Sequence, residues 1–331
     1  MTRLLSTRIS RRAVAAGAVP ASLALAGFPR APRAAGKQIA YLTPGLDLPF
    51  WRTLAKGIAD TGAGHGFKTT TYDSHNNAQT QLQNAQDAIA RKVDGIIISP
   101  TDSSTCPSVL DAAKRAGIPV VIADIGTTSG DYVSFIISDN TEGAYGTGVA
   151  FAKAMKAKGW EKGSVGLVTI SLARNNGKAR TAGFRKALAE AHIREAALSQ
   201  MQTYTADETF KFVQDMLTAH PDMRGLFIET DQPTIGALRA LQATRREGQV
   251  LVAAYDGIPE FVKLLKEGKI VASGMQQPYL MGERSALSLL AYLDGGKPDK
   301  TIIVPIEVVT SENVDKLLPT IRTTVFGNEM T

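Results

Sequence analysis

Short runs rich in β-branched residues alternate with longer amphipathic segments along most of this chain, and that alternation restricts the possible folds more than any other feature. In the amphipathic segments apolar residues recur every three or four positions, as Leu82, Ala85 and Ile89 do, which is typical of helices that cover a sheet. Strands and helices that alternate in this way form βα units on a parallel sheet. We predict strands at residues 39–43, 68–72, 95–99, 120–123, 133–138, 165–170, 198–202, 225–228, 251–255 and 271–275.

The predicted strands divide into two sets of about five, which indicates an α/β chain with two similar lobes, each a parallel β-sheet flanked by helices. The division lies at Ser138-Asp139-Asn140, where a strand ends and Thr141-Glu142-Gly143 begins a helix. No low-complexity linker separates the two sets, so the lobes should lie close together. A length of 331 residues also fits two domains.

Residues 1–35 have the order of an export signal. Basic residues, including Arg11-Arg12, precede a weakly apolar stretch, and small residues and prolines follow it. This order resembles a bacterial twin-arginine signal peptide, with an ordinary secretory signal as the alternative. A membrane anchor does not fit, because a span needs about 20 predominantly apolar residues and this stretch contains Pro20.

The net charge of +6 arises within the same segment. Residues 1–35 contain six arginines and no acid, so residues 36–331 carry 31 basic and 31 acidic side chains. A mature chain with no net charge gives no reason to expect a nucleic-acid or membrane-surface partner.

The motifs of common enzyme chemistry are missing from the chain. No strand is followed by the glycine-rich turn that holds a dinucleotide, and there is no phosphate-binding loop, nucleophile elbow or His-Glu-x-x-His. Four scattered histidines and the single Cys106 give no metal-ligand spacing and no disulfide within the chain. We therefore predict no catalytic residue, no metal and no cofactor, and an exported hydrolase remains the rival from the enzyme class.

Aspartates and aromatic residues follow several strands at the edge where parallel sheets bind ligands. Carboxylates accept hydrogen bonds from hydroxyl groups, and aromatic faces pack on the C–H face of a sugar ring. Each aspartate alone has a simpler interpretation as a turn or helix cap, but together they indicate a sugar or polyol site. The residues are Asp47, Phe50 and Trp51 after the first strand, and Asp124, Asp231 and Asp256 after later ones.

The order of several motifs resembles that of the ribose-type periplasmic sugar-binding proteins of ABC importers, from about Lys37 to about Val309. The motifs are Leu48-Pro49-Phe50-Trp51, Asp73-Ser74-His75-Asn76-Asn77, residues 93–102 (VDGIIISPTD), Ser138-Asp139-Asn140, Thr218-Ala219-His220-Pro221-Asp222, residues 236–241 (GALRAL) and Tyr255-Asp256-Gly257.

The resemblance implies the periplasmic binding protein type I fold, with two lobes joined by a three-segment hinge. The implied N-terminal lobe is 36–138 plus 277–306, and the C-terminal lobe is 139–276 plus 307–331, after the signal peptide at 1–35. It also implies a ligand ring held between an aromatic side chain of each lobe, with polar groups around its edge. The implied ligand-binding residues are Phe50 or Trp51, Tyr204, Asp124, Asp256 and Gln276, and the strand-end pattern adds Asp231.

The chain departs from the ribose-binding pattern where that pattern has strong donors. Leu48, Ser99 and Thr230 stand where the family has asparagine, and Ile125 and Lys178 stand where it has arginine. Without the bidentate arginine at Ile125 we expect poor binding of ribose and a ligand with an apolar edge against Leu48 and Ile125. Alternatively, both side chains point into their own lobe and Lys178 and others donate from new directions.

We therefore predict a solute-binding receptor rather than an enzyme. It is expected to be exported to the periplasm, to bind a sugar or sugar-like polyol as a monomer, and to deliver it to the permease of an ABC importer. A receptor that reports to a transmembrane chemoreceptor is an alternative that the sequence does not separate from transport. A sugar-responsive repressor is excluded by the export signal and by the lack of a DNA-binding segment before the first strand.

Overall fold

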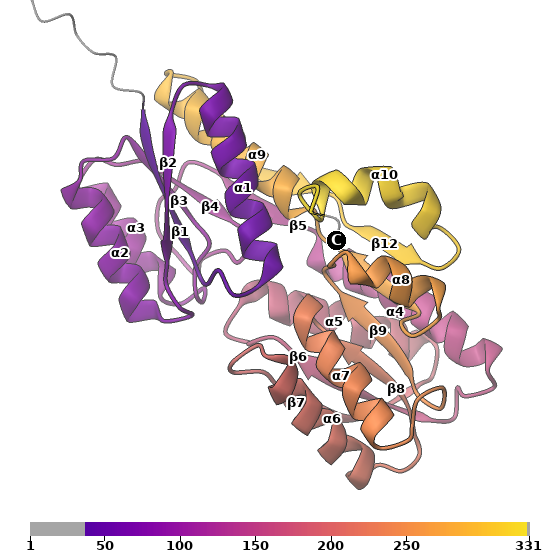
Figure 1. The fold of residues 1–331 in the computed structure, drawn as a ribbon. Helices are drawn as coiled ribbons and strands as arrows, with labels where there is room; N and C mark the ends of the chain where they lie inside the picture. The colour runs from indigo at the N-terminus through magenta and orange to yellow at the C-terminus, as the bar shows by residue number, and fades with distance from the viewer. Residues whose placement is uncertain (1–36, 330–331) are drawn as a thin grey trace, which may run out of the picture. The chain divides into compact units, whose positions relative to one another are not determined.

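The computed structural model describes residues 37–329 and contains two six-stranded sheets (Figure 1). In the first sheet every neighbouring pair of strands is parallel. Its order is β11 (Thr301–Val304), β5 (Phe135–Ser138), β4 (Val120–Ala123), β3 (Gly95–Ile98), β1 (Gln38–Thr43) and β2 (Lys68–Asp73).

The second sheet repeats this arrangement with one antiparallel edge. Strands β6 to β10 pair in parallel, and β12 runs antiparallel to β10. The order is β12 (Glu307–Thr310), β10 (Ala272–Met275), β9 (Leu251–Tyr255), β8 (Met223–Ile228), β6 (Ser164–Thr169) and β7 (Arg194–Gln200).

Helices pack on both sheets through apolar faces. The first lobe, as we define it, is the first sheet with α1 (Pro49–Gly64), α2 (Ala78–Ala90), α3 (Cys106–Arg115) and α9 (Pro278–Leu293). The second lobe is the second sheet with α4 (Asn140–Ala157), α5 (Asn175–Glu190), α6 (Ala206–Ala219), α7 (Asp231–Ala243), α8 (Glu260–Lys266) and α10 (Val314–Thr324). No helix within residues 37–329 has both the length and the apolar character to cross a bilayer.

The predicted fold class is confirmed, with two corrections at sheet edges. The predicted strand at 198–202 begins earlier, at Arg194, and ends at Gln200, because this edge strand pairs only with β6 and so tolerates polar residues at its start. Strand β12 was not expected, since it has only four residues, of which Glu307 and Thr310 are polar. The predicted export signal at 1–35 lies outside the described residues.

The chain passes between the two sheets three times. It leaves the first sheet after β5, returns to it between β10 and α9, and leaves it again between β11 and β12. As a result α9 and β11, which come late in the sequence, belong to the first lobe, and Figure 1 shows α9 beside α1.

Helices α1 and α9 meet at two glycines. A Cβ atom at Gly57 would overlap the carbonyl oxygen of Tyr279, and one at Gly282 would overlap that of Leu54. The missing side chains let the two backbones approach closely, which fixes the late segment of the chain against the first helix. This packing positions the start of α1, which carries Phe50 and Trp51.

We predict that Gly57→Ala destabilises the protein by about 1–3 kcal/mol, because the added methyl group must push a backbone carbonyl away. Gly64→Ala, at the end of the same helix, is the matched control: its Cβ would meet nothing within 4 Å. Urea unfolding of both variants measures the difference. Equal midpoints for the two variants would show that the α1–α9 contact has room for a side chain.

Candidate functional site

The carboxyl ends of strands from both sheets contribute residues to a cleft with two adjoining chambers. The smaller one, here called the inner chamber, is closely surrounded by side chains of both lobes. Its walls are Leu48, Phe50, Trp51 and Asp124 of the first lobe, and Ile170, Arg174, Asn176, Arg180, Tyr204, Thr230 and Asp256 of the second.

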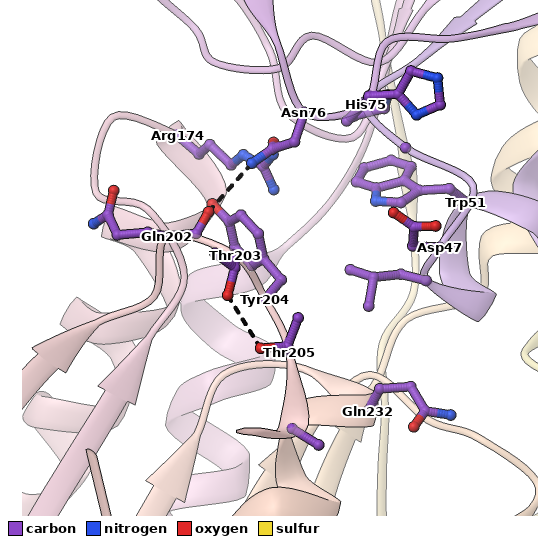
Figure 2. Close-up of a pocket in the computed structure, with 14 residues that line it drawn as sticks. Asp47, Trp51, His75, Asn76, Arg174, Gln202, Thr203, Tyr204, Thr205 and Gln232 are labelled. Atoms are coloured by element: carbon purple, nitrogen blue, oxygen red, sulfur yellow. Dashed lines mark hydrogen bonds between the residues drawn. The ribbon is translucent and has the colours of Figure 1, made fainter. Parts of the chain in front are cut away.

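The larger one, the outer chamber, has a volume of about 660 Å³ and is drawn in Figure 2. It shares Leu48, Trp51, Arg174 and Tyr204 with the inner chamber. These four side chains therefore border both spaces. The remaining lining residues are Pro44, Gly45, Asp47, His75, Asn76, Gln202, Thr203, Thr205, Ala206 and Gln232.

Asp256 lies at the centre of a buried polar network at the base of the inner chamber. Its Oδ2 accepts a hydrogen bond from Nη1 of Arg180 at 3.0 Å, and its Oδ1 accepts one from Nε2 of Gln276 at 2.8 Å. Arg180 also donates to Asn140 Oδ1 at 2.9 Å and lies over the Tyr255 ring, 4.2 Å from its centroid. The carboxylate and the guanidinium are thus held in place before any ligand arrives.

Asp124 faces the same chamber from the first lobe and is only 1% exposed. Its Oδ2 accepts a hydrogen bond from Asn176 Nδ2 of the second lobe at 2.8 Å, whereas its Oδ1 has no partner among the described residues. Burial raises the pKa of Asp124 to about 6, with Arg180 opposing the shift. A buried acceptor without a partner is costly, so Oδ1 is a site where a ligand hydroxyl would be stabilising.

Three of the predicted site residues have left-handed backbones. The φ angles are 71° at Asp124, 59° at Asp256 and 57° at Tyr204. Such conformations are unfavourable for residues other than glycine and concentrate at functional sites. Here each one directs a side chain into the wall of the inner chamber.

Arg174 links the two lobes from the loop before α5. Its Nε donates to the carbonyl of Thr101 at 2.8 Å and its Nη2 donates to Asn76 Oδ1 at 2.7 Å. The guanidinium also lies over the Tyr204 ring, 4.8 Å from its centroid. Arg174 is 4% exposed, its two hydrogen-bond acceptors among the described residues are uncharged, and it lines both chambers, so its charge is available to groups inside the cleft.

The structure places three predicted residues away from both chambers. Ile125 is fully buried in the first-lobe core, so the prediction that it contacts an apolar edge of the ligand is wrong. Of the two residues predicted to make that contact, Leu48 lines the inner chamber. Ser99 is also buried, with its Oγ 3.1 Å from the hydroxyl of Tyr41. Lys178 is exposed on α5, because its position on the helix faces away from the cleft.

Two more predicted residues lie behind the wall. Asp231 lines neither chamber; its Oδ1 accepts hydrogen bonds from the backbone N–H of Gln232 and from the hydroxyl of Thr230. Gln276 contacts the inner chamber through Asp256, and its Oε1 has no partner among the described residues.

Arg174, Asn176 and Arg180 are site residues that the sequence reasoning missed. Asn176, Arg180 and Phe184 recur every four residues on the buried face of α5, whereas Lys178 falls between them. That periodicity was the available signal: it places Arg180, and not Lys178, on the buried face of the helix.

Residues suited to covalent or metal chemistry do not gather in this cleft. Cys106 is buried at the start of α3, and burial raises the pKa of its thiol to about 12, which leaves it a poor nucleophile. Within residues 37–329 no group of three or more histidine, cysteine or acidic side chains could hold a metal ion.

Comparisons with known proteins extend over both lobes. A family model described as a periplasmic binding protein domain matches residues 39–297. The ribose import binding protein of Salmonella typhimurium is 33% identical over 278 residues, which cover 83% of this chain and 90% of that protein.

Solved structures share the fold. A carbohydrate transporter solute binding protein from Agrobacterium radiobacter, in complex with D-arabinose, has a TM-score of 0.81 at 24% identity and covers 88% of this chain and 99% of that one. An ABC transporter periplasmic solute binding protein from Actinobacillus succinogenes, with bound D-allose, has a TM-score of 0.78 at 25% identity and covers 85% and 99%.

Glu229 is a buried carboxyl group directly behind the inner chamber. Its Oε2 accepts a hydrogen bond from the N–H of Ile170 at 3.1 Å, and its Oε1 lies 2.6 Å from the hydroxyl of Thr181. Burial raises its pKa to about 8, against the hydrogen bond from Thr181 and the charge of Arg180. The folded protein therefore holds a proton here over a pH range in which the unfolded chain, with an ordinary pKa of 4.5, has lost it.

We predict that the free energy of unfolding falls as pH rises from about 5 to 7.5, because the folded state binds more protons than the unfolded state. Glu229 alone contributes a slope of about 1.4 kcal/mol per pH unit. Glu229→Gln, a neutral side chain of the same shape, should flatten the slope in urea unfolding, whereas the exposed Glu161→Gln should not. An unchanged slope in Glu229→Gln would mean that Glu229 is ionised in the folded protein.

Proposed function

The chain belongs to the periplasmic binding protein family, and on that basis we propose that it is the solute-binding receptor of an ABC import system with a sugar or sugar-like polyol as its ligand. Its relatives include a ribose import binding protein, and its structural neighbours were solved with D-arabinose and D-allose. We propose that the ligand ring enters the inner chamber between the two lobes.

The observation that carries this proposal is the pair of buried carboxylates, Asp124 and Asp256, that face one chamber from opposite lobes. Carboxylates accept hydrogen bonds from hydroxyl groups, and a polyol can supply several in one plane. Trp51 and Tyr204 flank the same chamber and offer apolar faces for the C–H groups of a ring. This combination suits a neutral polyhydroxylated ring.

The donors in this site come from the second lobe. Because position 125 is isoleucine, the first lobe contributes no guanidinium to the chamber. Arg180 of α5 and Arg174 of the loop before it line the chamber instead. Ile125 therefore gives no reason to exclude ribose. We propose that Leu48, which lies in the wall of both chambers, is the residue that disfavours a hydroxyl on one edge of the ligand.

Several further properties follow from the same proposal. We propose that residues 1–35 direct export to the periplasm, that the mature chain acts as a monomer, and that it presents its ligand to the permease subunits of the importer. The lobes are proposed to meet at 138/139, 276/277 and 306/307, next to the three passages between the sheets. A ligand that contacts both lobes favours the closed arrangement because it binds that arrangement more tightly.

We predict that Asp124→Asn lowers sugar affinity about ten- to a hundred-fold, because a hydrogen bond to a charged group contributes about 1.5–3 kcal/mol. A thermal-shift screen of sugars and polyols selects the ligand, and calorimetry measures its binding. The exposed Asp111→Asn, from the same lobe, is the control and should bind like wild type. If no sugar or polyol raises the melting temperature of the wild type, the proposed function is wrong.

We predict that Arg174→Ala weakens binding of the same ligand at least tenfold, because it removes a donor from the chamber and two contacts between the lobes. Arg185→Ala, which removes a half-exposed arginine from α5, should leave affinity unchanged. Calorimetric titration of both variants with the ligand measures the two affinities. Wild-type affinity in Arg174→Ala would place this guanidinium outside the binding site.

A further inference from the structure

The outer chamber is large enough for a chemical group of its own. Its volume of about 660 Å³ lies within the range of about 300–1,000 Å³ typical of small-molecule sites. Residues of both lobes line it, and four of them also line the inner chamber. A ligand seated in the inner chamber would therefore meet this space directly past Trp51 and Tyr204.

The lining of the outer chamber resembles a sugar subsite. Figure 2 shows Trp51 and Tyr204 on opposite sides of the space, and both side chains are buried. Exposed amide and hydroxyl groups surround them, from Gln202, Thr203, Thr205 and Gln232. Aromatic faces with polar groups at the rim suit a ring that has both C–H and hydroxyl surfaces.

The loop that carries Tyr204 is held rigidly by one carboxylate. Glu208 accepts hydrogen bonds from the backbone N–H groups of Gln202 at 2.8 Å, Thr203 at 2.9 Å and Tyr204 at 3.0 Å. These bonds support the left-handed backbone of Tyr204, with φ of 57°. The ring is therefore fixed in place between the chambers, which reduces the entropy lost when a ligand packs on it.

Two side chains in the lining have N–H donors without a hydrogen-bond partner among the described residues. Arg174 uses Nε and Nη2 for Thr101 and Asn76, and its Nη1 has no hydrogen-bond partner among the described residues. The side-chain amide of Gln232 likewise has none there. The acidic and basic side chains in the lining are one aspartate, Asp47, one arginine, Arg174, and one histidine, His75, so the chamber has no cluster of like charges that would select an ionic group.

We propose that the ligand has two linked rings, as in a disaccharide, with one ring in the inner chamber and a neutral, hydroxylated second ring in the outer chamber. This inference rests on the proposed function, since it assigns the sugar site of the inner chamber to the first ring. Trp51 and Tyr204 then contact both rings, and Gln232 and the loop at 202–205 bind the second ring only.

The test compares monosaccharides with disaccharides that contain them. D-glucose, D-galactose and D-xylose are titrated beside cellobiose, maltose, lactose, melibiose and xylobiose, with the wild type and two variants. Gln232→Trp places a bulky side chain in the lining of the outer chamber at the start of α7, and Gln242→Trp adds the same side chain at an exposed position at the far end of that helix. Thermal unfolding confirms that both variants are folded.

We expect one disaccharide to bind the wild type at least tenfold more tightly than its component monosaccharides. Gln232→Trp should lower that affinity at least tenfold while leaving monosaccharide binding within about twofold, and Gln242→Trp should change neither. Monosaccharides that bind as tightly as the disaccharides, or equal losses for both in Gln232→Trp, would overturn the second-ring site and leave the proposed function intact. Failure of every sugar here, together with every sugar and polyol of the thermal-shift screen, would overturn both.

Discussion

A buried guanidinium holds the base of the cleft together. Arg180 donates to the side chain of Asn140 at the start of α4, to the carbonyl of Glu229 after β8 and to the carboxylate of Asp256 after β9. Removing such a pair of charges from water is costly, so it is tolerated only where the remaining hydrogen bonds are also made. These bonds fix the ends of β8 and β9 and the start of α4 relative to one another. The geometry of the site depends on these fixed positions.

The start of α5 contacts both the inner chamber and the first lobe. Asn176 bonds to Asp124, the backbone N–H of Asn175 donates to Ser103 Oγ at 3.1 Å, and Arg174 bonds to Thr101 and Asn76. These contacts between the lobes come from the same short segment that lines the chamber. Ligand binding and contact between the lobes are therefore physically coupled, because a change in one moves the residues that make the other.

The fold was predictable because its strands are buried on both faces and are rich in β-branched residues, as in β3 and β4. The predicted bounds of β7 were shifted along the chain and β12 was not predicted, because an edge strand need not be apolar. In the site, Asp124 and Asp256 could be found because each directly follows a strand, and the edge of a parallel sheet collects such residues. Arg174 and Arg180 could not be found in this way, because an arginine on or near a helix is normally solvated. For Arg180 the one sign in the sequence is its four-residue spacing from Asn176 and Phe184, and Arg174, in the loop before α5, has no such sign; the packing of α5 buries both and turns Lys178 outward.

The most direct test of this account is a crystal structure of the chain with the sugar that stabilises it most. We expect ring hydroxyls within hydrogen-bond distance of the Asp124 and Asp256 carboxylates, with Arg174 and Arg180 as donors and the ring between Trp51 and Tyr204. A sugar bound elsewhere on the molecule, or in the cleft without contact to either carboxylate, would contradict it.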